Sequence, residues 1–197
     1  QERVVSAAER AYKGAILSPM ELIEIAALLR SSRAVLDYSS ADRTFETSLD
    51  ETFARLIPNR DLENKITRSI LSEDMIADEA SPALADIRRK IRQANNKIKD
   101  TLQSYVGGAR LKYLQENLVT MRNGRYVVPV KAEYRNEIKG LVHDTSSSGA
   151  TLFVEPISVV EANNELKTLA TEEEREIERI LSALSSECGD ACSVISL

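Results

Sequence analysis

Tryptophan is absent from this 197-residue sequence, and histidine, cysteine, proline and glycine are scarce. His143 is the single histidine, so the chain cannot build a histidine-based metal cluster, and its two cysteines give only a weak zinc signal. No glycine is followed by lysine, which excludes the phosphate-binding loop of many ATPases. We therefore expect no catalytic residue, cofactor-binding residue, metal ligand or small-molecule substrate in this chain.

Long apolar runs are also missing. No stretch approaches the roughly 18 apolar residues that span a bilayer, and no signal-peptide pattern opens the chain. Cys188 and Cys192 lie four residues apart, as on one helix face, and no disulfide framework indicates secretion. We expect a cytoplasmic protein without a membrane partner. Because the chain begins with Gln1 rather than methionine, we also expect a piece of a longer protein.

The low proline and glycine content favours long helices, and three helix starts are marked. Ser18 can cap a helix that has proline at its first position and Glu21 three residues after the cap, and this helix should reach about Asp37. Ser81 and the following proline repeat the pattern. Glu155, also followed by proline, opens a third helix less clearly.

Two of these helices carry a near-heptad pattern that predicts long, packed, antiparallel helices. The pattern of the first is Leu84, Ile87, Ile91, Ala94, Ile98, Leu102 and Tyr105. The pattern of the second is Val159, Asn163, Leu166, Ala170, Glu173, Ile177, Ile180, Leu184, Cys188 and Ala191.

The segment between these helices contains the only clear β pattern. Strands are expected at 118–121, 126–130, 138–143 and 151–154. Asn123 and the glycine after it predict a hairpin, residues 145–149 a turn, and Pro129 an edge or bulge position. The serines of the turn are expected to bond turn backbone groups, with donation to phosphate as the alternative.

Residues 1–80 read as shorter helices, with Met75 to Ala80 as a loop. Two apolar faces are expected there, one with Leu49, Phe53 and Leu56 and one with Leu62, Ile66 and Ile70. The predicted fold is mainly α. It has a helical core base at 1–80, long antiparallel helices at 81–118 and 156–197, and a small antiparallel β segment at 119–155.

Charge is unevenly distributed along this chain of net charge −5. Residues 81–118 hold eight basic and three acidic residues, residues 119–154 five and three, and residues 155–180 three and eight. An acidic chain is a poor general binder of nucleic acid, but a local basic surface can still contact phosphate. The candidate contacts are Arg122, Arg125, Lys131, Arg135, Lys139 and His143.

Each candidate has a structural alternative. Charges on strands and turns also serve solubility and protect sheet edges, and His143 is favoured as a structural residue over a phosphate contact. The basic residues of the first long helix are expected to form a solvated face, partly paired with the acidic run at 172–178. They are Arg88, Arg89, Lys90, Arg92, Lys97 and Lys99.

Several stretches resemble the bacterial MutS-two family. They read RNGRYVVPVKAEYR at 122–135, HDTSSSGATLFVEP at 143–156, VVEANNEL at 159–166 and EEEREIERIL at 172–181. Weaker matches are LSPMEL at 17–22 and ASPAL at 80–84. The resemblance extends over essentially the whole chain.

The resemblance implies an architecture and a function. In MutS-like proteins a helical core and two lever helices precede an ATPase domain, and a β-rich clamp at the far end of the levers approaches DNA. The chain would be the lever and clamp portion. Its homodimeric parent would use ATP and Mg²⁺, carry a C-terminal small-MutS-related endonuclease domain and suppress homologous recombination. No ATPase or nuclease activity is expected in this portion.

Three functions follow for the chain itself. It would engage branched or duplex DNA and couple that contact to the ATPase. Alternatively it would be the ribosome- or rRNA-engaging arm of a protein that rescues collided ribosomes, or a purely structural dimerisation arm. The basic residues at 122–139 argue against the last, and binding assays with DNA and ribosomes separate the first two.

Overall fold

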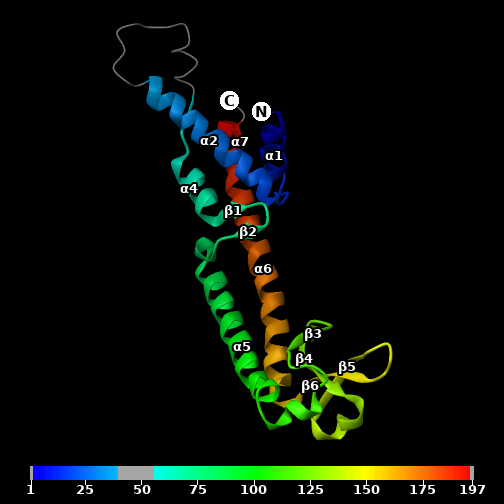
Figure 1. Ribbon diagram of the computed structural model, residues 1–197. Helices are drawn as coiled ribbons and strands as arrows, with labels where there is room; N and C mark the ends of the chain where they lie inside the picture. Colours follow the sequence, from blue (N-terminus) through cyan, green and yellow to red (C-terminus); the bar gives the residue numbers. More distant parts are fainter. Residues whose placement is uncertain (1, 40–55, 196–197) are drawn as a thin grey trace. The chain divides into compact units, whose positions relative to one another are not determined.

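The computed structural model describes residues 2–39 and 56–195, and its fold is mainly α (Figure 1). By its internal contacts the chain forms two compact units. Unit 1 takes residues 1–85 and 174–197, and unit 2 takes residues 86–173. The division into a base, two levers and a clamp stays a prediction.

Unit 1 is helical with a small antiparallel β pair. Its elements are α1 (Glu2–Tyr12), α2 (Pro19–Ser39), α4 (Arg60–Ser69), β1 (Ile70–Ser72), β2 (Met75–Ile76), η1 (Asp78–Ala80), the first residues of α5 (Pro82–Val106), the last part of α6 (Val160–Asp190) and α7 (Cys192–Ile195).

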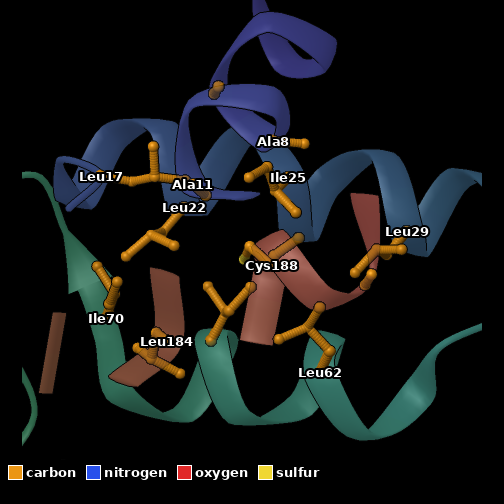
Figure 2. Packing of buried hydrophobic residues seen from close by; sticks show 14 of the residues in the cluster. Ala8, Ala11, Leu17, Leu22, Ile25, Leu29, Leu62, Ile70, Leu184 and Cys188 are labelled. Atoms are coloured by element: carbon orange, nitrogen blue, oxygen red, sulfur yellow. The ribbon is translucent and has the colours of Figure 1, made fainter. Parts of the chain in front are cut away.

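The core of unit 1 is formed by apolar faces of α1, α2, α4 and α6 (Figure 2). Leu22 and Ile25 of α2 are fully buried, as is Ile66 of α4. Their three- and four-residue spacing within each helix is what places them on one face. Cys188 of α6 is fully buried in this cluster, and burial raises the pKa of its thiol to about 12.

One glycine allows two helices of unit 1 to touch. A Cβ placed on Gly189 of α6 would lie 2.8 Å from the backbone carbon of Ala11 in α1. Any side chain at this position would therefore force the two backbones apart.

The predicted helix starts in unit 1 are confirmed. The Ser18 N–H donates to Glu21 Oε2 at 2.9 Å, and the Glu21 N–H donates to Ser18 Oγ at 3.3 Å, which is a capping box. Ser81 Oγ accepts from the N–H of Leu84 at 3.0 Å and donates to Glu176 Oε1 at 2.6 Å. Each cap satisfies a backbone donor that has no partner within its own helix.

Unit 2 holds a four-stranded antiparallel sheet between the two long helices in sequence (Figure 1). The strand order is β3 (Thr120–Arg122), β4 (Arg125–Lys131), β6 (Thr151–Pro156) and β5 (Gly140–Thr145). Short 3-10 helices are η2 (Ala109–Tyr113), η3 (Ala132–Glu137) and η4 (Ile157–Val159).

The core of unit 2 joins one face of the sheet to the two helices. Ile98 and Leu102 of α5 pack with Val128 and Val154 of the sheet and with Ala162 of α6. The parts of α5 and α6 in this unit run antiparallel. Arg88 pairs with Glu173 at one end, and Tyr105 Oη lies 3.2 Å from Ser158 Oγ at the other.

The predicted hairpin and turn of the sheet are confirmed. Asn123 and Gly124 have φ values of 52° and 72°, the left-handed conformations of a tight two-residue turn between β3 and β4. Pro129 lies beyond the end of β3, which pairs only with residues 125–127 of β4. Its carbonyl accepts from the N–H of Gln115 at 2.8 Å and Leu114 bridges to Val130, so residues 114–115 flank the strand here in place of β3, and Pro129 is not at an open edge.

Several boundaries predicted from the sequence are wrong. Glu155 and Pro156 end β6 instead of opening a helix, and α6 begins at Val160 after a 3-10 turn. The third strand runs at 140–145 rather than 138–143, because Ile138 is buried in the core before the strand begins. On α6 the structure exposes Ala170 and buries Leu169, the larger apolar side chain.

The N-terminal prediction needs two corrections. Ile70 is buried with α4 but belongs to β1, and residues 70–76 form a small hairpin where a helix end and a loop were expected. Strands of two or three residues are too short to show the alternation of apolar and polar residues by which a strand is recognised in a sequence. Of the other predicted apolar face, Leu49 and Phe53 lie outside the described residues.

Candidate nucleic-acid interface

The predicted contact residues divide into two groups within unit 2. Arg125 and His143 bind a buried carboxylate and Arg135 binds two backbone carbonyls, whereas Arg122 and Lys131 contact aromatic rings and Lys139 is exposed.

The first group is organised around Glu155, whose side chain is completely buried in β6. Nε of Arg125 lies 3.1 and 3.2 Å from its two carboxylate oxygens, and Nη2 of the same guanidinium also donates to it. Asn163 Nδ2 donates at 3.0 Å, and His143 Nε2 contacts the second oxygen. Burial raises the pKa of this carboxyl, but the hydrogen bonds from Arg125, Asn163 and His143 outweigh it and hold the pKa below its ordinary value.

His143 reaches this carboxylate from a β-bulge. In the β5–β6 pair, Val142 lies opposite Val154 and Asp144 lies opposite Phe153, so His143 is the extra residue. Because an ionised carboxylate only accepts hydrogen bonds, the hydrogen must be on Nε2.

Arg135 ties η3 to the start of β5. Its guanidinium donates to the carbonyls of Ile138 at 3.2 Å and Gly140 at 3.0 Å. The nearby Lys139 side chain is exposed.

Arg122 of β3 lies directly opposite Arg125 of β4, and its side chain reaches Phe153 of β6 and Asp144 of β5. Its guanidinium carbon is 4.0 Å from the centroid of the Phe153 ring. Nη1 donates to Thr120 Oγ1 at 3.2 Å and to the Met121 carbonyl at 2.8 Å, and Nε is 3.4 Å from Asp144. The side chain is therefore fixed in direction while remaining about one-third exposed, at 36%.

Lys131 belongs to a group of cations and rings that the sequence analysis did not identify. We call it the aromatic–cationic cluster, and it consists of Arg110, Lys112, Lys131, Tyr105, Tyr113 and Tyr134. The three cations lie 4.5, 4.9 and 5.9 Å from the ring centroids of the three tyrosines in that order.

The cluster brings η2 and η3 together. The rings of Tyr113 and Tyr134 are 5.3 Å apart between centroids, and Lys131 Nζ donates to the Lys112 carbonyl at 3.3 Å. Arg110 and Lys112 had been counted only in the basic charge of 81–118. Residues 109–113 read ARLKY, so the available signal was two basic residues close to a single tyrosine.

The basic residues of α5 follow the expected pattern. Arg88 pairs with Glu173 at 2.6 Å, and Lys90 pairs with Asp86 of its own helix at 2.8 Å. Arg89 also pairs with Asp86. The acidic run thus supplies Glu173 as a partner for Arg88, and α5 itself supplies Asp86 as a partner for Arg89 and Lys90.

Within 2–39 and 56–195, no group of three or more histidine, cysteine, aspartate or glutamate side chains is placed to hold a metal ion. No helix in the described part of the chain combines the length and apolar character needed to cross a membrane.

Comparison with known proteins identifies the family. No family model matches the chain. Its sequence is 50% identical over 184 residues to a protein of Acetivibrio thermocellus named Endonuclease MutS2, an alignment that covers 91% of this chain and 23% of that protein. The chain belongs to the MutS2 family. Proteins of the same name from Caldanaerobacter subterraneus subsp. tengcongensis and Clostridioides difficile are 56% and 46% identical over 74% and 92% of the chain, covering 18% and 24% of the relatives.

This MutS2 chain thus spans about a quarter of the length of the curated relatives it matches. Those relatives are named endonucleases. The high identity over most of the chain agrees with the resemblance found in residues 122–181.

Proposed function

We propose that unit 2 binds the phosphate backbone of nucleic acid through the aromatic–cationic cluster. The observation that carries this proposal is the fixed position of three cations on tyrosine rings. A cation over a ring is held in place at a gain of about 0.5–1 kcal/mol at an exposed site, and its N–H groups still point outward to other acceptors. Lys112 and Lys131, which are joined by a hydrogen bond, and Arg110 of the same 3-10 helix as Lys112 would then supply donors for phosphate oxygens.

The net charge of the chain favours contact with nucleic acid at a local basic surface over attraction by the chain as a whole. The whole chain carries a net charge of −5, so a polyanion is repelled by most of it. Arg110 and Lys112 are exposed, and Lys139 adds another exposed cation in the same unit. We assign Arg122, Lys131 and Lys139 to the proposed interface, and Arg125, Arg135 and His143 to holding the sheet that carries it.

The relatives support the same class of ligand, because an endonuclease acts on nucleic acid. For the longer MutS2 protein, we propose that this contact is coupled to the ATPase implied by the family resemblance, with a role in suppressing recombination at branched DNA. The chain would then be the engaging portion, and ATP with Mg²⁺ would act elsewhere in the parent.

A salt titration tests the proposal. Binding of the chain to a fluorescent DNA duplex and to a branched junction is measured by anisotropy between low and physiological salt. Each phosphate contact contributes a log–log slope of about −0.9 on duplex DNA. Replacing Arg110, Lys112 and Lys131 with glutamine should therefore reduce the slope by about 2–3.

The matched control replaces Arg89, Lys90 and Lys99 of α5 with glutamine and removes the same charge. It should leave the slope near that of the wild type, because Arg89 and Lys90 are paired with Asp86. Equal slopes for the wild type and the cluster variant would reject the proposal. Binding to ribosomes but not to DNA would favour the rRNA-engaging arm, and dimerisation without either would favour the structural arm.

A further inference from the structure

A groove of about 350 Å³ lies beside Arg122 in unit 2, apart from the aromatic–cationic cluster. Its strand residues share one face of the sheet, since Pro129 lies opposite Phe153 and Thr120 opposite Val127, and residues 115–118 border it. The lining residues are Gln115, Glu116, Leu118, Thr120, Arg122, Pro129, Ser146, Thr151 and Phe153. Its volume falls within the range of about 300–1,000 Å³ that is usual for ligand clefts.

One wall of the groove is a flat stack. The Arg122 guanidinium lies over the Phe153 ring at 4.0 Å, and Pro129 adds an apolar surface beside them. Guanidinium planes and aromatic rings are the surfaces on which unpaired nucleobases stack in proteins. A paired base in a duplex cannot reach such a wall, because its faces are covered by its neighbours.

The same groove offers hydrogen-bond donors. Nη1 and Nε of Arg122 are directed at Thr120, Met121 and Asp144, which leaves the Nη2 hydrogens for a ligand. Thr120 Oγ1 accepts from Arg122, so its own hydrogen can be donated.

The serine turn adds another donor. Ser146 Oγ accepts from the Thr151 N–H at 3.1 Å and lies 3.3 Å from Ser148 Oγ. Ser148 Oγ accepts from the Ala150 N–H at 3.4 Å. Since only one of the two hydroxyl hydrogens is needed between the serines, the other can be donated. Donors next to a stacking wall suit a base and its phosphate.

We propose that this groove binds an unpaired nucleotide of a single-stranded or branched nucleic acid, with the base on the Arg122–Phe153 stack and the phosphate at the Arg122 and serine donors. The inference rests on the proposed function and deepens it, because the groove adds a preference for unpaired strands to a contact that is otherwise blind to base pairing. Glu116 lies in the lining, and its negative charge should lower the affinity for phosphate.

The experiment measures binding of the full chain to three oligonucleotides of equal phosphate number: a single-stranded DNA, a DNA duplex of half its length and a single-stranded RNA. Each single strand carries 2-aminopurine, whose fluorescence falls when the base stacks. We expect the wild type to bind a single strand more tightly than the duplex and to quench the probe. Tighter binding of the DNA or of the RNA strand identifies which one is the source of the unpaired nucleotide.

Two variants test the groove in opposite directions. Arg122→Lys keeps the charge but loses the flat surface, and it should weaken single-strand binding about tenfold, abolish quenching and change duplex binding less than twofold. Glu116→Gln should strengthen single-strand binding several-fold, whereas Glu133→Gln, a change to an exposed residue of η3, should not.

The outcomes separate the two proposals. Duplex binding that depends on the aromatic–cationic cluster, with no single-strand preference and no quenching, overturns the groove and leaves the proposed function standing. An equal effect of Arg122→Lys on single strand and duplex also overturns the groove. Failure of the wild type to bind any of the three oligonucleotides overturns both.

Discussion

The contact between Arg125 and Glu155 should be the most sensitive polar interaction in unit 2. The carboxylate is fully buried, and the arginine side chain is only 13% exposed. Replacing Arg125 with methionine preserves much of the packing but leaves a buried carboxylate with only Asn163 and His143 as partners. Removing one member of a buried pair costs about 3–5 kcal/mol, because the remaining charge is uncompensated.

We expect a value near the lower end of that range, about 3 kcal/mol at pH 7, because two hydrogen bonds to the carboxylate survive. Replacing Glu155 with glutamine as well should recover part of the loss, since no charge is then left without a partner. The matched control is Arg122→Met. Its partner Asp144 is 52% exposed, so the loss should stay below about 1 kcal/mol.

The effect should depend on pH. In the wild type the pKa of Glu155 lies below its ordinary value, so its stabilising contribution is complete above that ordinary pKa of 4.5 and is lost as the pH falls through the lowered one. In Arg125→Met the main cause of the lowering is gone and burial raises the pKa. The difference between variant and wild type should therefore shrink as the pH falls from 7 towards 4.

Urea unfolding followed by circular dichroism, together with hydrogen exchange of amides in β4 and β6, gives these free energies for unit 2. A loss below 1 kcal/mol for Arg125→Met, or a loss that does not change with pH, would refute the reasoning that the pair is desolvated and charged.

Three further predictions concern unit 1. Ser81→Ala removes a buried cap and the donor to a carboxylate, and urea titration should show a loss of about 1–2 kcal/mol, more than for Ser18→Ala at the exposed cap. Gly189→Ala should lower the midpoint of thermal unfolding because its Cβ would clash with the α1 backbone, and an unchanged midpoint would contradict the close approach. Cys188, with its pKa raised to about 12 by burial, should resist iodoacetamide at pH 8 until the chain is denatured, as mass spectrometry of the labelled protein would show.

Local signals in the sequence predicted the features that local chemistry determines. The capping box at Ser18 and the cap at Ser81 depend on residues three positions apart, and the hairpin at Asn123 depends on two. The apolar spacing of α5 likewise identified Ile98 and Leu102 as buried residues. Such interactions need no knowledge of the rest of the fold.

The features that could not be predicted from the sequence depend on contacts between residues that are far apart in the chain. The partner of Arg125 is 30 positions away, and Asn163 joins the same carboxylate from α6, so a residue that resembled a phosphate contact proved to be paired inside. The aromatic–cationic cluster was missed for the same reason, because Tyr113 and Tyr134 meet only when η2 and η3 fold together. The sequence does not distinguish an exposed arginine from a buried one, because burial depends on the strand that packs opposite it.

Unit 1 is built from two stretches of chain that are far apart in the sequence, and this affects the order in which the two units can fold during synthesis. Its core needs Leu184 and Cys188, which emerge from the ribosome after all of unit 2 has been synthesised. During synthesis, unit 2 has all its own residues first and can fold while the apolar faces of α1, α2 and α4 still wait for α6. A nascent chain from which residues up to 173 have left the ribosome would therefore carry a complete sheet and an unfinished helical core, whose apolar faces stay exposed during that interval.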